Sequence, residues 1–150
     1  MKNVAVNKSV SHDYIVLETL EAGLALVGSE VKSVRAGRIS LKECYAEVRA
    51  GEVFLVKCHI SPYEAANIFN HDPLRERKLL LHRREIKRLA GKTQERGLTL
   101  VPTRVFLGDR GKIKVELALA RGKREHEKRE AIKKRDTDRE IRAALKNRSR

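Results

Sequence analysis

The last thirty residues of the chain limit what it can fold into, because they offer almost nothing to a hydrophobic core. This segment, RGKREHEKREAIKKRDTDREIRAALKNRSR, contains 13 Lys or Arg and 6 Asp or Glu residues, a net charge of +7. Its larger apolar residues are Ile132, Ile141 and Leu145, which form no continuous stripe at helical spacing. A compact core must therefore come from the first 120 residues, a length that suits one domain.

The charge of the whole chain indicates an acidic polymer as partner. The net charge is +14, and the first 120 residues carry half of it. Nucleic acid and an anionic membrane surface both suit a protein this basic. The sequence has no apolar run long enough to span a membrane, no signal-peptide pattern and no lipidation motif. We therefore expect a cytosolic protein that acts on nucleic acid and not on a membrane.

Pairs of apolar segments predict three β-hairpins in the first 120 residues. The first hairpin covers residues 14–28 and turns at Glu21-Ala22-Gly23. The second joins residues 40–49 to 53–60, and the third joins residues 98–107 to 112–120. Sequential antiparallel hairpins of this kind favour a small barrel or an open sheet with a helix packed on it.

Two details of the third hairpin are specific enough to test. The segment KIKVELALA alternates, which places four apolar residues on one face: Ile113, Val115, Leu117 and Leu119. Pro102 lacks the N–H that a central strand would use, so its strand should lie at a sheet edge or contain a bulge.

Two helices are expected around these strands. Residues 29–38 predict a short helix that begins at Ser29, ends at Gly37 and presents three basic side chains: Lys32, Arg35 and Arg38. Residues 82–97 predict a longer helix that ends at Gly97. Residues 61–77 contain two prolines and no clean period, and predict a long loop. The fold class is mainly β: a small antiparallel oligonucleotide-binding-type barrel with peripheral helices and a basic C-terminal tail.

The tail combines low hydrophobicity with high helix propensity. Lys, Arg, Glu and Ala dominate it, and opposite charges occur four residues apart, as in Glu125 with Arg129. We expect residues 1–121 to form an RNA-binding body, and residues 122–150 to be disordered when free and helical on a polyanion. A solubilising tail with no target is the alternative.

Residue types that carry chemistry are present without a recognisable catalytic pattern. Cys44 and Cys58 lie in apolar segments and predict free, partly buried thiols, in preference to a disulfide or a zinc site. His71 and Asp72 precede Pro73, where an Asx-type turn is the simpler interpretation. Nucleophile-elbow, zinc-protease and phosphate-loop motifs are missing from the sequence. We expect no enzyme, no metal and no cofactor, although a catalytic pair from distant residues stays open.

Aromatic residues are scarce: the chain has three Tyr, three Phe and no Trp. Proteins that bind any single strand usually stack bases on aromatic side chains. The composition therefore favours a protein that recognises RNA shape and phosphate. We also expect the protein to be a monomer.

Four segments resemble one family in order: EAGLALVGSEVKSVRAGR, HISPYEAANIFNHDPLRERKLLLHRREI, GLTLVP and KVELALARGK, followed by the basic tail. They resemble small protein B, the family of SsrA-binding proteins, from about Asn7 to the end of the tail. The resemblance implies an oligonucleotide-binding-type barrel that binds the tRNA-like domain of transfer-messenger RNA. It also implies a role in trans-translation, the rescue of stalled bacterial ribosomes, in which the tail becomes helical in the empty mRNA channel and the decoding region of the small-subunit rRNA.

The resemblance implies roles for individual residues. Glu21, Leu80 and His82 match positions that hold the tRNA-like domain, and Lys32, Arg35 and Arg38 are expected to contact phosphates. In the tail, six residues match the block that acts in the decoding centre: Lys123, Arg124, His126, Glu127, Lys128 and Arg129. His82 replaces an Asn, Glu127 an Asp and Arg124 a Lys that are common in the family. From the pattern alone, Leu80 would be a core residue, because it is the middle of three leucines.

Two other functions fit the composition. A structural ribosomal protein with a basic extension would have the same charge distribution. An RNA-processing enzyme that uses His71 and His82 is the third hypothesis.

Overall fold

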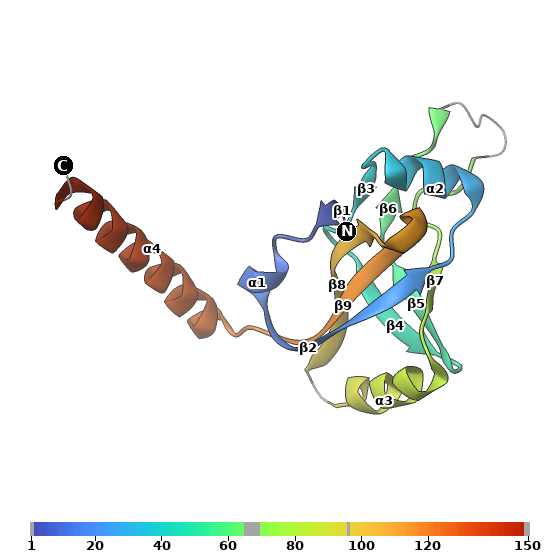
Figure 1. Ribbon diagram of the computed structural model, residues 1–150. Coiled ribbons are helices and arrows are strands. Elements are labelled where there is room, and N and C mark those ends of the chain that lie inside the picture. Colours follow the sequence, from blue (N-terminus) through green and yellow to red (C-terminus); the bar gives the residue numbers. More distant parts are fainter. Residues whose placement is uncertain (1, 65–69, 96, 149–150) are drawn as a thin grey trace.

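A computed structural model of the chain describes residues 2–64, 70–95 and 97–148, and in the last helix it describes the side chains of Arg129 and of residues 133–146. A β-barrel forms the body, and one long helix extends away from it (Figure 1). Two further helices lie at opposite ends of the barrel (Figure 1).

The described elements follow one another in this order: β1 (Lys2–Val6), α1 (Val10–Asp13), β2 (Tyr14–Leu24), α2 (Gly28–Arg35), β3 (Ile39–Ser40), β4 (Tyr45–Arg49), β5 (Glu52–Val56), β6 (His59–Ile60), β7 (Arg77–Leu80), α3 (Arg83–Thr93), β8 (Leu98–Leu107), a 3-10 turn (Asp109–Gly111), β9 (Ile113–Gly122) and α4 (Glu125–Arg148).

The main sheet closes on itself. Its strand order is β1-β8-β4-β5-β7-β2-β9, and β8 also pairs with β9, so that the strands from β8 to β9 form a ring and β1 joins it on β8. All pairings in this sheet are antiparallel. Closure provides hydrogen-bond partners for backbone N–H and C=O groups that would be unpaired at the edges of an open sheet. The mainly β, antiparallel fold predicted from the sequence is confirmed.

The core follows the alternation of the last strand. Ile113, Val115, Leu117 and Leu119 are all buried, as predicted. The strand containing Pro102 pairs with β9 on one side, and its register shifts between Pro102 and Arg104. The bulge predicted from the missing donor is therefore present.

The first predicted hairpin is wrong. Residues 14–24 form the single continuous strand β2, and Glu21, Ala22 and Gly23 pair with β9 instead of turning. Gly23 also pairs with Leu80 of β7, and a Cβ added at Gly23 would lie 3.2 Å from the Leu80 Cβ. The glycine thus permits a close approach of two strands, the other common reason for glycine inside a strand.

The second and third hairpins are confirmed, with shorter strands in the second. The β4–β5 turn has Ala50 at φ 50° and Gly51 at φ 77°, as a two-residue turn between twisted strands requires.

The two predicted helices of the body are confirmed, but the first begins differently, and the second ends at Thr93 instead of the predicted Gly97. The N-cap of α2 is Val27, whose N–H donates to Glu30 Oε1 at 2.9 Å, so the start predicted at Ser29 is wrong. Ser29 instead bonds to His71 Nδ1 at 2.8 Å. Gly37 has the positive φ of 78° that ends a helix.

The free cysteines and the Asx-type turn at Asp72 are confirmed. Cys44 and Cys58 are free and buried. Asp72 Oδ1 accepts a hydrogen bond from the Leu74 N–H at 2.9 Å, which is the predicted Asx-type turn.

The tail carries the helix α4, whose described side chains are exposed. Its behaviour in the free protein stays a prediction. Within the described residues, none of the helices has the length and apolar character needed to cross a membrane.

Candidate nucleic-acid interface

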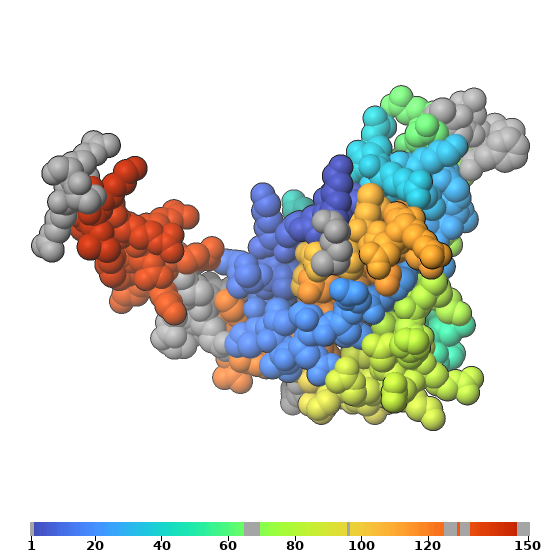
Figure 2. Space-filling view, viewed as in Figure 1, coloured from blue at the N-terminus to red at the C-terminus, as the bar shows by residue number. Residues whose placement is uncertain are grey.

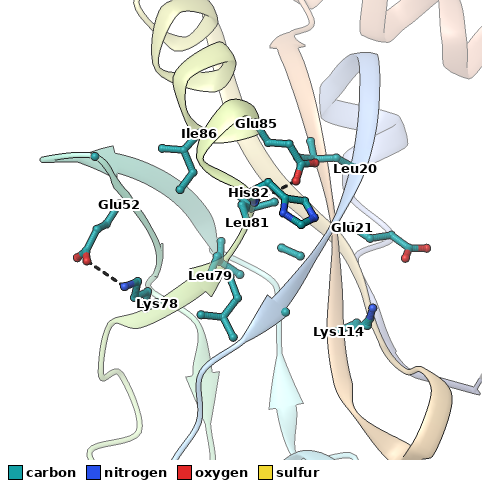
Figure 3. Close-up of a pocket in the computed structure, with 14 residues that line it drawn as sticks. Leu20, Glu21, Glu52, Lys78, Leu79, Leu81, His82, Glu85, Ile86 and Lys114 are labelled. Carbon is teal, nitrogen blue, oxygen red and sulfur yellow. Dashed lines mark hydrogen bonds and ion pairs between the residues drawn. The ribbon is translucent and has the colours of Figure 1, made fainter.

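Three cavities open beside β2 and β9, and Lys114 of β9 lines all of them. The largest has a volume of about 760 Å³ and lies between β2, β7 and the beginning of α3. Three residues predicted to hold RNA line it together: Glu21, Leu80 and His82. Figure 3 shows His82 and Glu85 at the beginning of α3, with Glu21 and Lys114 on the strands at the other side of the hollow. The structure thus brings together Glu21 and two residues that lie about sixty positions later in the sequence.

Leu80 is the residue whose position the sequence pattern misjudged. Along β7 burial alternates, so that Arg77 and Leu79 point inward while Lys78 and Leu80 point outward. Leu80 is 53% exposed, and the core packing expected from the leucine run is wrong. An exposed leucine beside polar groups suits contact with the face of a base or sugar.

The polar residues of the largest cavity leave groups available for a ligand. In the described part of the chain, Glu21 is exposed on β2 and makes no side-chain hydrogen bond or ion pair. His82 is the N-cap of α3, and its backbone N–H donates to Glu85 Oε1 at 3.1 Å. The cavity therefore presents a carboxylate acceptor and an imidazole around an apolar residue.

A second cavity adjoins the first across Leu80. It measures about 410 Å³ and lies between α2, β2 and the loop that leads into β9. Arg35 lines it, and its Nη2 donates to the Gly111 carbonyl oxygen at 3.4 Å, which links the loop to α2. Lys112 and Lys114 complete its basic rim.

Lys114 is the main residue that the sequence analysis missed. It lines the first two cavities and also a third, of about 460 Å³, beside the β8–β9 turn. The alternation of KIKVELALA does place Lys114 on the outward face. The pairing of Lys114 with Gly23 of β2 could not be read from that alternation.

The other two predicted cations, Lys32 in α2 and Arg38 three residues after its end, lie away from these cavities. Lys32 Nζ is 5.3 Å from the centroid of the Tyr63 ring, and Arg38 forms an ion pair of 3.9 Å with Glu64. Both are exposed and lie beside the segment that follows β6. They belong to a different part of the surface than Arg35.

A buried ion cluster anchors α2 to the barrel. The Glu30 carboxylate accepts hydrogen bonds from Arg75 Nη2 and Arg77 Nε, both at 2.5 Å, and Glu30 and Arg77 are fully buried. Burial alone raises the pKa of Glu30, but the bonds from Arg75, the Val27 N–H and Arg77 outweigh it and hold the pKa below its usual value. This cluster fixes the helix that carries Arg35.

The beginning of the tail is attached to the body. The Lys123 N–H donates to the Asp13 carbonyl oxygen at 2.7 Å, and Lys123 Nζ donates to the Ser11 carbonyl oxygen at 2.8 Å. Arg124 and Arg129 are exposed. The side chains of His126, Glu127 and Lys128 lie outside the described residues. In Figure 2 the described part of the tail stands away from the barrel.

Comparisons with known proteins agree on one family. The family model described as SmpB protein matches residues 4–147. The SsrA-binding protein of Symbiobacterium thermophilum is 58% identical over 145 residues, which cover 97% of this chain and 92% of that protein. The SsrA-binding protein of Enterococcus faecalis is 53% identical over 146 residues, covering 97% and 94%.

A solved structure gives the same result. It is described as "tmRNA-SmpB: a journey to the center of the bacterial ribosome", and one of its chains matches with a TM-score of 0.69 at 47% identity, over 85% of this chain and 93% of that one. Fold, motifs and relatives therefore confirm the resemblance found in the sequence, and this chain belongs to the SmpB protein family.

Proposed function

We propose that this protein is a cytoplasmic RNA-binding adaptor, which binds the tRNA-like domain of transfer-messenger RNA and delivers it to stalled ribosomes for trans-translation. Its relatives are SsrA-binding proteins, and a structural neighbour was solved with tmRNA and the bacterial ribosome as its subject. The observation that carries the proposal is the exposed Leu80 between Glu21 and His82 in the largest cavity.

Each residue of this cavity suits one feature of folded RNA. Leu80 offers an apolar contact to a base or ribose, and Glu21 accepts hydrogen bonds from base amino groups or a 2′-hydroxyl. His82 donates or accepts at a base edge, as the Asn common at this position in the family would. Lys114 and Arg35 lie close enough to the same face to contact phosphates, which position RNA without reading its sequence.

The tail supports a later, ribosomal step in this proposal. The helix α4 is rich in Lys and Arg, and its described side chains are exposed. In the mRNA channel it would exchange water for rRNA phosphates, and Lys123 and Arg124 would enter the decoding region together with the block from His126 to Arg129. Lys123 would then leave the Ser11 carbonyl that it contacts in the free chain.

The relatives favour an adaptor over a structural ribosomal protein, because they are named for binding SsrA. In the adaptor role the chain binds and positions RNA, and no catalytic step is assigned to it.

Binding to the isolated tRNA-like domain tests the proposal. Elongator tRNA serves as competitor, and the full chain is compared with a variant that ends at Gly122. We expect both proteins to bind the tRNA-like domain with similar affinity and to prefer it over elongator tRNA. Equal competition by elongator tRNA, or loss of binding with the tail, would instead indicate charge-driven binding and favour the ribosomal-protein hypothesis.

A further inference from the structure

The cavity between α2 and β9 is chemically unlike the larger one beside it. Its walls are apolar side chains from four elements and the segment between β2 and α2: Leu24, Leu26, Val31, Leu80 and Ile113. Its lining contains three cations and no Asp or Glu, whereas Glu21, Glu52 and Glu85 line the larger cavity. An apolar hollow with a basic rim fits a ligand that joins an uncharged flat group to an anion.

We propose that this cavity holds one unpaired nucleobase of the bound RNA, with the adjacent phosphate on Arg35, Lys112 and Lys114. The inference rests on the proposed RNA-binding function and specifies one subsite of that interface. A nucleobase is flat and largely apolar on its faces, and it is linked to a phosphate on each side, so it combines the two properties that the lining selects.

The basic rim is available to a phosphate. Among the residues described by the structure, none of the three rim cations forms an ion pair with a carboxylate. Within the described residues, the hydrogen bond found for the Arg35 side chain is the long one of 3.4 Å to the Gly111 carbonyl oxygen. A phosphate would therefore replace water, and it would not have to break an existing ion pair.

The wall formed by Leu80 is held in place by the strand beside it. Leu80 pairs with Gly23, and the space above that glycine is occupied by the Leu80 side chain, with Cβ and Cδ1 at 3.2 and 3.4 Å from where a glycine Cβ would be. Leu80 lines both cavities and separates them. An RNA strand that crosses this leucine would place one nucleotide on each side of it.

A matched control cavity lies elsewhere on the body. It measures about 460 Å³ between β4 and α3, and its lining includes Ala90 but no Lys or Arg. Filling it should leave RNA binding unchanged, because it lacks the groups that hold a phosphate.

The experiment measures binding of the full chain to the tRNA-like domain. Val31→Phe fills the proposed subsite, and Ala90→Phe fills the control cavity. We expect Val31→Phe to weaken binding about tenfold, as loss of one stacked base would, and Ala90→Phe to leave it within about twofold. A photoreactive side chain at Leu26 should crosslink to one unpaired nucleotide, and one at Ala90 should not.

A second variant keeps the test valid if Val31→Phe is poorly folded. Lys114→Gln should lower the salt dependence of binding, by about 0.7 in the slope of log affinity against log salt for one lost phosphate contact. The wild-type affinity and the two crosslinking measurements do not use the Val31→Phe variant, so a folding defect in that variant does not affect them.

The outcomes separate this inference from the proposed function. If wild-type protein does not select the tRNA-like domain, the proposed function fails. If it does, but neither Val31→Phe nor Lys114→Gln alters binding and Leu26 crosslinks to no nucleotide, the subsite is refuted. Anionic phospholipid vesicles that compete with RNA for wild-type protein but not for Val31→Phe would overturn it too, because the cavity would then take an acyl chain.

Discussion

The RNA-facing side of the barrel and the tail helix are both basic, but they use charge differently. On the body, Arg35, Lys112 and Lys114 surround a cavity whose walls come from the closed sheet, α2 and the segment between β2 and α2. On α4 the described cations are exposed, and even Ile141 and Leu145 are 53% and 60% exposed. Charge on a fixed shape can discriminate between RNAs, whereas charge on an isolated helix follows any polyanion of suitable form.

The body and the described part of α4 differ in burial. The body contains a buried core and an ion cluster at Glu30, so its surface groups have fixed positions. The described part of α4 contributes no buried side chain, and such helices are marginal in water by themselves. Binding by the body should therefore depend on individual residues, and binding by the tail on total charge.

The largest expected effect is on the stability of the body. Arg77→Met leaves the buried Glu30 carboxylate with only Arg75 as its cationic partner, and removal of one member of a buried pair destabilises by about 3–5 kcal/mol. Urea denaturation followed by fluorescence or circular dichroism measures the loss. Arg75→Met is the matched control with a smaller effect, because Arg75 is partly exposed. Equal stability of Arg77→Met and wild type would show that the cluster does not anchor α2.

The next effect concerns recognition and not stability. Leu80→Asp places a charge where the RNA is expected to make an apolar contact, and should weaken binding of the tRNA-like domain by roughly 30-fold, about 2 kcal/mol. Leu74→Asp is the control, since Leu74 is 56% exposed but lines none of the three cavities. Equal losses in both variants would mean that the cavity face only attracts RNA by charge, as we expect of the tail.

A smaller effect on the free energy of unfolding should appear as the pH falls. The folded-state pKa of Glu30 is below its unfolded value, so its contribution to stability is present above the unfolded value of about 4.3 and is lost as the pH falls through the folded-state value. Removal of Arg75, the strongest of the groups that lower this pKa, should make the acid limb of the stability curve shallower. Measuring unfolding free energy between pH 7 and acid for wild type and Arg75→Met tests this; parallel curves would contradict it.

The smallest effect is expected in the tail. Leu145→Ala removes an exposed side chain and should change the free energy of unfolding by less than about 0.5 kcal/mol. Leu119→Ala makes the same substitution in the buried core and should cost about 2–5 kcal/mol. Thermal and urea unfolding of both variants measure this contrast. A large effect of Leu145→Ala would show that the tail packs on the body in solution.

Local pattern predicted much of the body. The alternation of β9, the β4–β5 turn, the helix α3 and the bulge at Pro102 each depend on a few neighbouring residues, and all are present. The turn predicted at residues 21–23 is wrong because turn propensity is a local property, whereas the pairing of β2 with β9 and β7 depends on distant residues. At this position, pairing with distant strands determined the backbone conformation.

The candidate site was only partly predictable. Glu21, Leu80 and His82 came from the resemblance to a family, and the structure places them around one cavity. Pattern alone put Leu80 in the core, because three consecutive leucines show no period that distinguishes the two faces of a strand. Side chains alternate along β7, so Leu80 points outward because Arg77 points inward. A buried arginine is expected only when its partner is known, and that partner is Glu30.

By itself, the sequence determined the properties that depend on composition and near neighbours: a mainly β body, an uneven distribution of charge, buried free thiols and a helix-prone tail. Only the tertiary structure decided which strands meet, and therefore that Lys114, Leu80 and Arg35 share one surface. The physical reason is that strand alternation specifies two faces but not their neighbours. Cavities form between elements, so their walls exist only after the barrel has closed.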